Sequence, residues 1–256
     1  MNDYVDEYIR KMRLTGLISL RGAGHFVDIN HNENEKVKYV LSKYSTYEKY
    51  DTEREYFDYM AEIDENLFSI ESVRITESQS ENLLVNWLAV FNWDNIKREL
   101  LILAGKKLTR DNVLKFLSAP VRLEFLIALA VKSRFPNVRV IPNYACDDTG
   151  LPTSTAAGGK GDIECFESQH GILVEVTMAE GRQQTIMEIW PIDRHLTEFK
   201  EKYMQTSQAV FVAPTIYCDS QRQISWVKND NNNLIRPYRI VEFIQYLESS
   251  KYFYAS

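Results

Sequence analysis

Residues 160–188 contain the pattern that most restricts how this chain can fold. Residues 162–166 alternate enough to form a strand, and residues 167–171 are rich in turn-forming residues. Residues 172–178 are apolar and β-branched, which is typical of a second strand. Gly181 then opens a predicted helix. The segment therefore predicts a β-hairpin followed by a helix.

Two carboxylates of this hairpin are predicted to lie close together. Asp162 is near the start of the first strand and Glu175 is in the middle of the second. Side chains on one face of an antiparallel pair lie within about 5 to 8 Å of each other. Such carboxylates repel each other unless a positive charge lies between them, and Mg²⁺ commonly binds one or two carboxylates together with water and phosphate oxygens. The Val176 carbonyl and the Glu188 side chain would reach the same pocket.

The alternative is that these acids are solvated surface charges, which is the commoner role of two acids on neighbouring strands. Residues 173–177, however, form an apolar strand around Glu175. A buried carboxylate requires a partner or a metal ion. The position of Glu175 therefore favours a metal site.

The same residues resemble a known nuclease core. The arrangement G-D-I-E at residues 161–164, followed by V-E-V-T at residues 174–177, is similar to the PD-(D/E)XK core. Together with residues 14–30, it resembles the AlwI family of type IIS restriction and nicking endonucleases over most of the chain. The resemblance implies an α/β (α+β) fold with a mixed central sheet flanked by helices. It also implies a Mg²⁺-dependent deoxyribonuclease, with Mn²⁺ as a substitute ion, that leaves 5′-phosphate and 3′-hydroxyl ends.

The resemblance implies roles for individual residues. Asp162, Glu175 and the carbonyl of Val176 would hold the catalytic metal. Glu124 and Glu188 would support the site from the flanking helices, where they would hold a second ion or orient water. Taken alone, Glu124 fits equally well as a solvated residue on the polar side of its apolar helix.

One further residue and one departure from the wider superfamily complete the expected site. His195 would contact phosphate or support Glu188, seven residues away on the same helix face. Thr177 stands where many nucleases with this core have lysine. Lys160 is the candidate that would supply the missing positive charge.

Four basic residues are candidates for contacts with DNA phosphates. Lys160 ends a glycine-rich run that lacks the spacing of a P-loop. Arg182 and Arg194 lie on the predicted helix at residues 181–205. Arg21 lies in the glycine-rich turn of a predicted hairpin, which is either a DNA-contacting wing or a plain tight turn.

The charge distribution fits one surface that meets phosphates. The net charge of −6 argues against a protein that simply coats nucleic acid. Residues 46–94 hold twelve acids and three bases, whereas residues 97–139 hold ten bases and three acids. Such asymmetry fits one phosphate-binding surface, or equally well solvated helix faces of opposite sign.

The cysteines and the apolar segments indicate the cellular setting. Cys146, Cys165 and Cys218 have no C-x-x-C spacing and are predicted to be reduced thiols. The chain has no long apolar run and its first residues are polar and acidic. We expect a soluble protein of the prokaryotic cytoplasm with no membrane partner.

The chain is predicted to divide into two parts. Residues 1–105 would form a mostly helical linker module with a small winged-helix-like hairpin, and residues 106–256 would form the cleavage domain. The elements expected in the second part are a helix from residue 109 that Pro120 interrupts, a second helix at 121–134, a strand at 138–141, a loop at 144–161, strands at 208–213 and 225–227, and a last helix at 237–247.

The favoured function is a Mg²⁺-dependent endonuclease that cuts double-stranded DNA, one strand per active site. Cleavage of both strands would then require a second nuclease subunit or a homodimer. Two alternatives are a repair or branched-DNA nuclease with the same core and a non-catalytic winged-helix DNA-binding protein. The last of these would be indifferent to the loss of Asp162 and Glu175.

Overall fold

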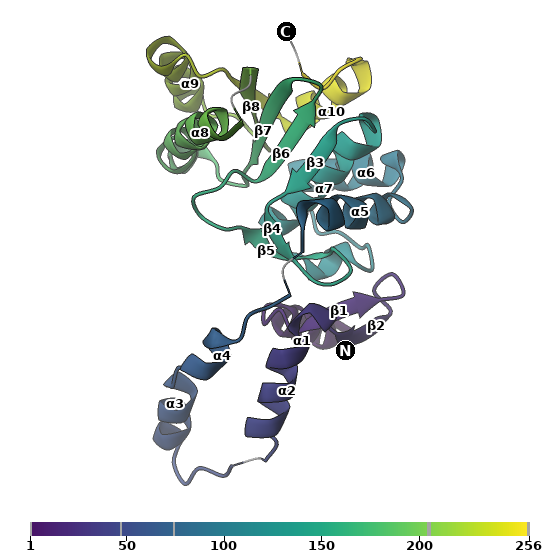
Figure 1. Cartoon of the computed structure of the whole chain (residues 1–256), viewed down its shortest axis with the longest axis vertical. Coiled ribbons are helices and arrows are strands. Elements are labelled where there is room, and N and C mark those ends of the chain that lie inside the picture. The colour runs from purple at the N-terminus through teal and green to yellow at the C-terminus, as the bar shows by residue number, and fades with distance from the viewer. Residues whose placement is uncertain (1, 47, 74, 204–205, 255–256) are drawn as a thin grey trace.

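A five-stranded sheet lies at the centre of the molecule, in the order β3-β6-β7-β8-β9 (Figure 1). The computed structural model describes residues 2–46, 48–73, 75–203 and 206–254. The strands of the sheet are β3 (Arg139–Pro142), β6 (Ile163–Glu167), β7 (His170–Val176), β8 (Thr206–Ala213) and β9 (Ile235–Arg239). Pairing is antiparallel from β3 through β6 to β7 and parallel from β7 through β8 to β9. The predicted mixed sheet is confirmed.

Helices cover both faces of this sheet (Figure 1). One face packs against α5 (Glu77–Leu88), α6 (Trp93–Ala104), α7 (Ala119–Arg134) and α10 (Ile240–Ser249), and the other against α8 (Gly181–Tyr203) and α9 (Cys218–Asn231). Side chains of a strand alternate between faces, so Ile172 and Val174 join the cluster around α7 while Leu173 joins the cluster around α8. The hairpin at residues 162–178 thus contributes side chains to both hydrophobic clusters, one on each face of the sheet.

Helix α7 is the most deeply buried element. Every residue from Val121 to Val131 is buried, because the helix lies between the sheet and α5 and α6. Pro120 lies in its first turn, where its missing N–H costs nothing. A helix that is buried all round has no single apolar stripe, and α7 carries both Arg122 and Glu124 in its buried stretch.

The N-terminal part consists of a hairpin and a helical arm. Its elements are α1 (Asn2–Arg13), β1 (Ile18–Arg21), β2 (Phe26–Ile29), η1 (His31–Glu33), α2 (Asn34–Lys43), α3 (Glu53–Ala61) and α4 (Glu65–Ser69). The predicted hairpin is confirmed. Helices α2, α3 and α4, here called the arm, extend away from the body of the molecule (Figure 1), and none of their described residues is buried.

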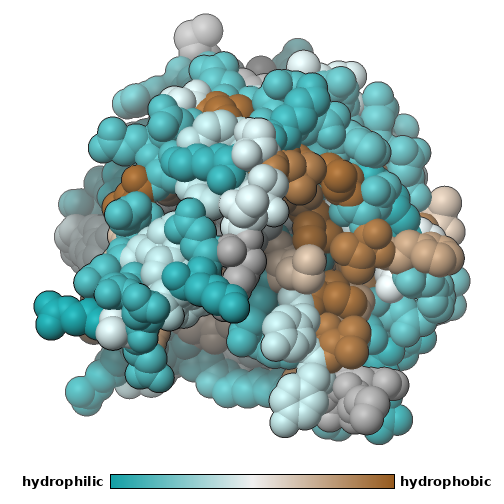
Figure 2. All heavy atoms as spheres, turned by 90° about the horizontal axis from the view of Figure 1, so that it is seen from below, coloured by the Kyte–Doolittle hydropathy of each residue, from teal (hydrophilic) through white to brown (hydrophobic). Residues whose placement is uncertain are grey.

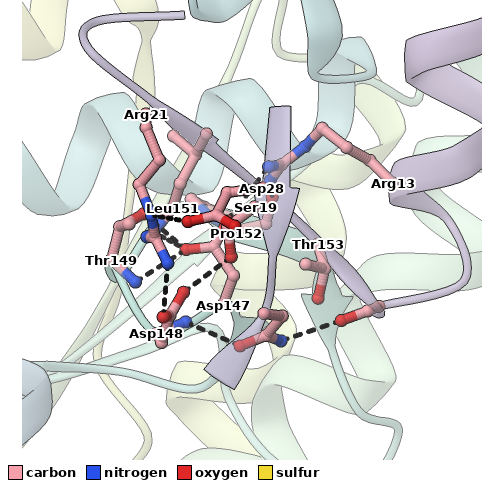
Figure 3. Close-up of polar contacts among 12 residues, drawn as sticks. Arg13, Ser19, Arg21, Asp28, Asp147, Asp148, Thr149, Leu151, Pro152 and Thr153 are labelled. Atoms are coloured by element: carbon pink, nitrogen blue, oxygen red, sulfur yellow. Dashed lines mark hydrogen bonds and ion pairs between the residues drawn. The ribbon is translucent and has the colours of Figure 1, made fainter. Parts of the chain in front are cut away.

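Two aspartates anchor α1 and the β1–β2 hairpin to the body (Figure 3). Asp147 accepts a hydrogen bond from Arg13 Nη1 at 3.0 Å, and both side chains are almost fully buried. Asp148 accepts from Ser19 Oγ and from Arg21 Nη2, both at 2.6 Å. These aspartates lie in the turn between β4 (Tyr144–Cys146) and β5 (Pro152–Ala156). The hairpin is therefore held by charge-assisted bonds to a turn that is remote in sequence.

Several predicted elements in the second half are wrong. The helix expected from residue 109 is only a single 3₁₀ turn, η2 (Leu114–Phe116), and the loop expected at residues 144–161 contains the β4–β5 hairpin. Residues 225–227 belong to α9, because Ser220, Ile224 and Val227 have helical spacing and face the core. Pro237 lies in β9, which is an edge strand and tolerates a residue without an N–H.

Other features of the prediction have mixed outcomes. Strands at 138–141 and 208–213 and the helix from Gly181 are confirmed within two residues; Gln205, the predicted end of that helix, lies outside the described residues. The boundary at residue 105 stays a prediction, although the cluster around α7 continues across it into α5 and α6. The three cysteines are free. None of the described helices has the length and apolar character that a membrane span requires.

We expect Arg13→Met to destabilise the protein by about 3 kcal/mol, because removing one partner of a buried ion pair leaves an uncompensated charge. Arg13 donates to Asp147 and also to the Pro152 carbonyl at 2.9 Å. Urea unfolding followed by circular dichroism measures the change. Arg54→Met is the matched control, since the Arg54–Asp58 pair at 3.9 Å is exposed. Equal unfolding free energies for the two variants would contradict this role of Arg13.

Candidate active site

A cavity of about 310 Å³ lies where α7 and α8 meet the end of the β6–β7 hairpin. It brings together most of the residues that the sequence singled out. Those lining it are Glu124, Lys160, Asp162, Glu175, Val176, Glu188 and His195. The cavity is therefore the candidate active site.

The hairpin register places the two central carboxylates side by side. Ile163 pairs with Val174, so that Asp162 and Glu175 are the next positions along the two strands. The Val176 N–H donates to Asp162 Oδ2 at 2.7 Å. Gly161 allows this close approach, because a Cβ there would lie 2.3 Å from the Leu173 side chain and 2.9 Å from Glu175 Oε1.

His195 approaches the site from α8 and contacts Glu175. Its Nδ1 lies 2.9 Å from Glu175 Oε1, and both side chains are mostly buried. Burial, followed by the charge of Arg194, lowers the pKa of His195 below its ordinary value of 6.5. A neutral imidazole that donates Nδ1–H to the carboxylate keeps Nε2 as an acceptor. Among the described residues, Nε2 is buried without a partner. His195 thus orients Glu175, whereas the sequence suggested Glu188.

Thr177 holds Glu188 in place. The Thr177 hydroxyl donates to Glu188 Oε1 at 2.7 Å and accepts from the Ala179 N–H at 3.0 Å. The residue that departs from the common lysine thus orients a carboxylate of the cavity. This role was missed from the sequence, where the only signal was a hydroxyl residue directly after the Glu-Val pair.

Glu124 reaches the site from the first half of α7. It is 4% exposed, and its Oε2 accepts from the Ala156 N–H at 3.0 Å. Ala156 is the last residue of β5. The β4–β5 hairpin, which the sequence did not reveal, therefore positions a carboxylate of the cavity.

The predicted DNA contacts occupy different environments. Lys160 is exposed at the cavity. Arg182 and Arg194 are exposed on α8, and Arg194 lies 4.0 Å from Glu198. Arg21 forms ion pairs with Asp148 at 2.6 Å and Asp28 at 3.3 Å. All four stay predictions as phosphate contacts.

Burial makes the carboxylates of the cavity hard to ionise together. Burial first, and then the charge of Asp162, raises the pKa of Glu124 to about 8. Burial is also the largest cause for Glu175, whose pKa rises to about 8, and for Glu188, whose pKa is raised. The pKa of Asp162 is raised by burial and by the charge of Glu175. A bound cation would relieve this repulsion.

The donors present suit a hard, hydrated cation. In the part of the chain that the structure describes, no three His, Cys, Asp or Glu side chains form a ready-made metal cluster. Mg²⁺ needs no such cluster, because it binds proteins through one or two carboxylates and keeps several waters. Asp162, Glu175 and the Val176 carbonyl match this requirement. A zinc site would need three or four converging side chains.

A mixed sheet with paired carboxylates at the end of a hairpin, supported by a carboxylate from each flanking helix, defines a nuclease of the restriction-endonuclease fold. The model of the AlwI restriction endonuclease family matches residues 1–112 and 92–245. The chain therefore belongs to the AlwI restriction endonuclease family, and its general activity is that of an endonuclease.

Among solved structures, the fold is similar to that of the small subunit of the heterodimeric restriction endonuclease R.BspD6I. The TM-score is 0.51 and the sequence identity is 23%, over 60% of this chain and 78% of that subunit. At this identity the likeness concerns the fold alone. No protein in the curated collection matches the chain.

We expect stability to fall as the pH rises, because Glu124 and Glu175 hold protons in the folded protein up to about pH 8 but release them near 4.5 when unfolded. The folded state binds more protons between these values, so the free energy of unfolding decreases across this range. Glu175→Gln stays neutral. One pKa unit corresponds to about 1.4 kcal/mol. Above pH 8, the free energy of unfolding of Glu175→Gln should therefore be about 2 to 4 kcal/mol higher than that of the wild type.

Urea unfolding between pH 5 and pH 8.5, without divalent cations, measures this difference. Glu201→Gln is the control, because Glu201 is exposed on α8 and should leave the pH profile unchanged. Parallel profiles for the wild type and Glu175→Gln would show that Glu175 does not carry the shifted proton.

Proposed function

We propose that this chain is a Mg²⁺-dependent endodeoxyribonuclease, the cleavage part or subunit of a type IIS restriction or nicking enzyme, with one strand cut per active site. The observation that carries the proposal is the pairing of Asp162 with Glu175, where the Val176 N–H bonds to Asp162 Oδ2 and His195 bonds to Glu175. Carboxylates kept close in a buried site, at the expense of stability, are typical of a metal-dependent catalytic centre.

The metal would be held by Asp162, Glu175 and the carbonyl of Val176. When bound, Mg²⁺ supplies charge neutralisation at the scissile phosphate and lowers the pKa of a coordinated water. The chain's own contribution is to orient both carboxylates and to oppose, in part, the effect of burial on their ionisation. The Val176 N–H and the His195 imidazole do so by donating hydrogen bonds to them.

Other groups of the cavity would position water and phosphate. Glu188 is held by Thr177 and keeps its second oxygen for a water molecule. The Nε2 of His195, which has no partner among the described residues, would accept a hydrogen bond from a water molecule in the cavity. Lys160, exposed at the rim, would provide the positive charge that a lysine at position 177 provides elsewhere.

Cleavage of both DNA strands would require a second active site. The solved relative is a small subunit of a heterodimeric enzyme, which favours a second nuclease subunit over a homodimer for this chain.

The arm offers a surface for such a partner. Large apolar side chains there are strongly exposed, among them Leu41, Phe57, Met60 and Phe68. Figure 2 shows a band of apolar side chains on the face seen from below, where the arm lies. Apolar patches of this kind commonly mark protein interfaces.

We expect the wild type with Mg²⁺ to convert supercoiled plasmid to the open-circular form, and Asp162→Ala and Glu175→Ala each to lose at least about 100-fold in rate, as for the loss of a group that stabilises the transition state. Gel electrophoresis of time points measures the rates. Glu201→Ala, an exposed carboxylate on α8, is the control for charge.

Cleavage that survives both substitutions would contradict the site. DNA binding without cleavage, unaffected by either change, would instead favour a non-catalytic DNA-binding protein. Activity confined to branched or damaged substrates would favour a repair nuclease with the same core.

His195→Ala should lower the nicking rate by about 10- to 100-fold, the usual cost of losing a group that orients a metal ligand. The apparent Mg²⁺ requirement should rise with it, because Glu175 loses the bond from Nδ1. Titration of the rate against Mg²⁺ separates this role from general-base catalysis, which would lower the rate at saturating Mg²⁺ and leave the Mg²⁺ requirement unchanged.

A further inference from the structure

A second cavity of about 660 Å³ lies beside the N-terminus of α7. Ser118, Ala119 and Arg122 line it from α7, and Arg10, Arg110 and Lys115 line it from other segments. It adjoins the active site along the chain, because Ala119 lines this cavity while Pro120 lines the active site. None of the groups proposed for metal binding contributes to it.

Arg122 is an incompletely paired cation in the wall of this cavity. The residue is 6% exposed. Among the described residues, no hydrogen bond reaches its guanidinium group, and its Nε is buried without a partner. A buried cation in this state is costly unless a ligand completes its bonds.

Glu99 is the protein group that comes nearest to neutralising Arg122. Glu99 is 2% exposed, and its charge acts on Arg122. Among the described residues, Arg122 and Glu99 do not form an ion pair within 4 Å. Glu99 Oε1 instead lies 3.4 Å from Arg98 Nε, and Glu99 Oε2 has no hydrogen-bond partner. Arg122 therefore keeps donors for another anion.

The first turn of α7 adds the Ala119 N–H to the same cavity, since Pro120 has no N–H and the Arg122 N–H bonds to the Ser118 carbonyl at 2.9 Å. This helix has 16 residues, and its N-cap residue Ser118 makes no side-chain capping bond. The N–H groups of a first helical turn have no acceptor within the helix, and they attract anions together with the helix dipole. Of the other cations, Arg10 pairs with Glu7 and Lys115 with Asp6 at 2.9 Å. Arg110 is exposed and has no ion pair in the described chain.

We propose that this cavity binds a backbone phosphate of the DNA strand beside the phosphate that is cut. Arg122 would form a bidentate contact to it, the Ala119 N–H at the start of α7 would donate a hydrogen bond, and Arg110 would add positive charge at the rim. The inference rests on the proposed function, because it assumes that DNA lies across the active-site cavity. A phosphate anchored by Arg122, two residues before Glu124 in the same helix, would fix the strand relative to the carboxylates.

DNA affinity tests this site independently of cleavage. Fluorescence anisotropy of a labelled duplex, without divalent cations and at several salt concentrations, measures the wild type, Arg122→Met, Arg122→Lys and Glu99→Gln. We expect Arg122→Met to bind about 10- to 100-fold more weakly. Its slope of log affinity against log salt should decrease in magnitude by about one. Arg122→Lys should recover part of the affinity, and Glu99→Gln should retain or increase it. Lys228→Ala, an exposed cation on α9, is the control.

Three outcomes would overturn the proposal. Affinity and salt slope that do not depend on residue 122, or no measurable DNA binding by the wild type, would leave Arg122 as a structural counter-ion of Glu99. If inorganic phosphate instead stabilises the wild type but not Arg122→Met in thermal unfolding while the DNA affinities stay equal, this result would assign the cavity to free phosphate.

If Arg122→Met does not fold, Arg122→Lys decides, since a lysine keeps the charge but loses the bidentate contact. If the wild type binds DNA in an Arg122-dependent way but does not nick plasmid, the proposed nuclease function is refuted and the phosphate site is not.

Discussion

The burial of charged carboxyl groups at the end of an apolar hairpin is the constraint on which the site depends. Glu175 is 6% exposed, in a strand whose neighbouring residues pack into hydrophobic clusters on both faces of the sheet. Placing a carboxylate there is unfavourable by itself. The two clusters and the almost fully buried α7 offset this cost, and they hold the backbone rigidly enough to keep Asp162 and Glu175 together.

Three carboxylates of the cavity are each oriented by a group from a different part of the chain. The neighbouring strand supplies the Val176 N–H for Asp162, and α8 supplies His195 for Glu175. The β4–β5 hairpin supplies the Ala156 N–H for Glu124. These hydrogen bonds favour the ionised carboxylates, whereas burial disfavours them. A cation bound in the cavity would therefore stabilise the ionised forms. This is a common compromise between stability and activity.

The β4–β5 hairpin also links the site to the N-terminal part of the molecule. Its last residue binds Glu124, and the aspartates of its turn bind Arg13, Ser19 and Arg21. The N-terminal hairpin and the arm are thus attached to an element that touches the active-site cavity.

The sequence pattern by itself determined the hairpin at residues 162–178 and the carboxylate within its apolar strand, because strand alternation and a carboxylate within an apolar run are local signals. The mixed nuclease core and the roles of Glu124, Glu188 and His195 were implied by the resemblance to the AlwI family. Only the tertiary structure decided that His195 contacts Glu175, that Thr177 holds Glu188, and which cations are paired. Distances between side chains of separate elements depend on packing, which local pattern does not encode. For the same reason residues 144–161 were predicted as a loop, since the short β4–β5 pair packs against α7 and its Pro152 carbonyl accepts a hydrogen bond from Arg13 of α1.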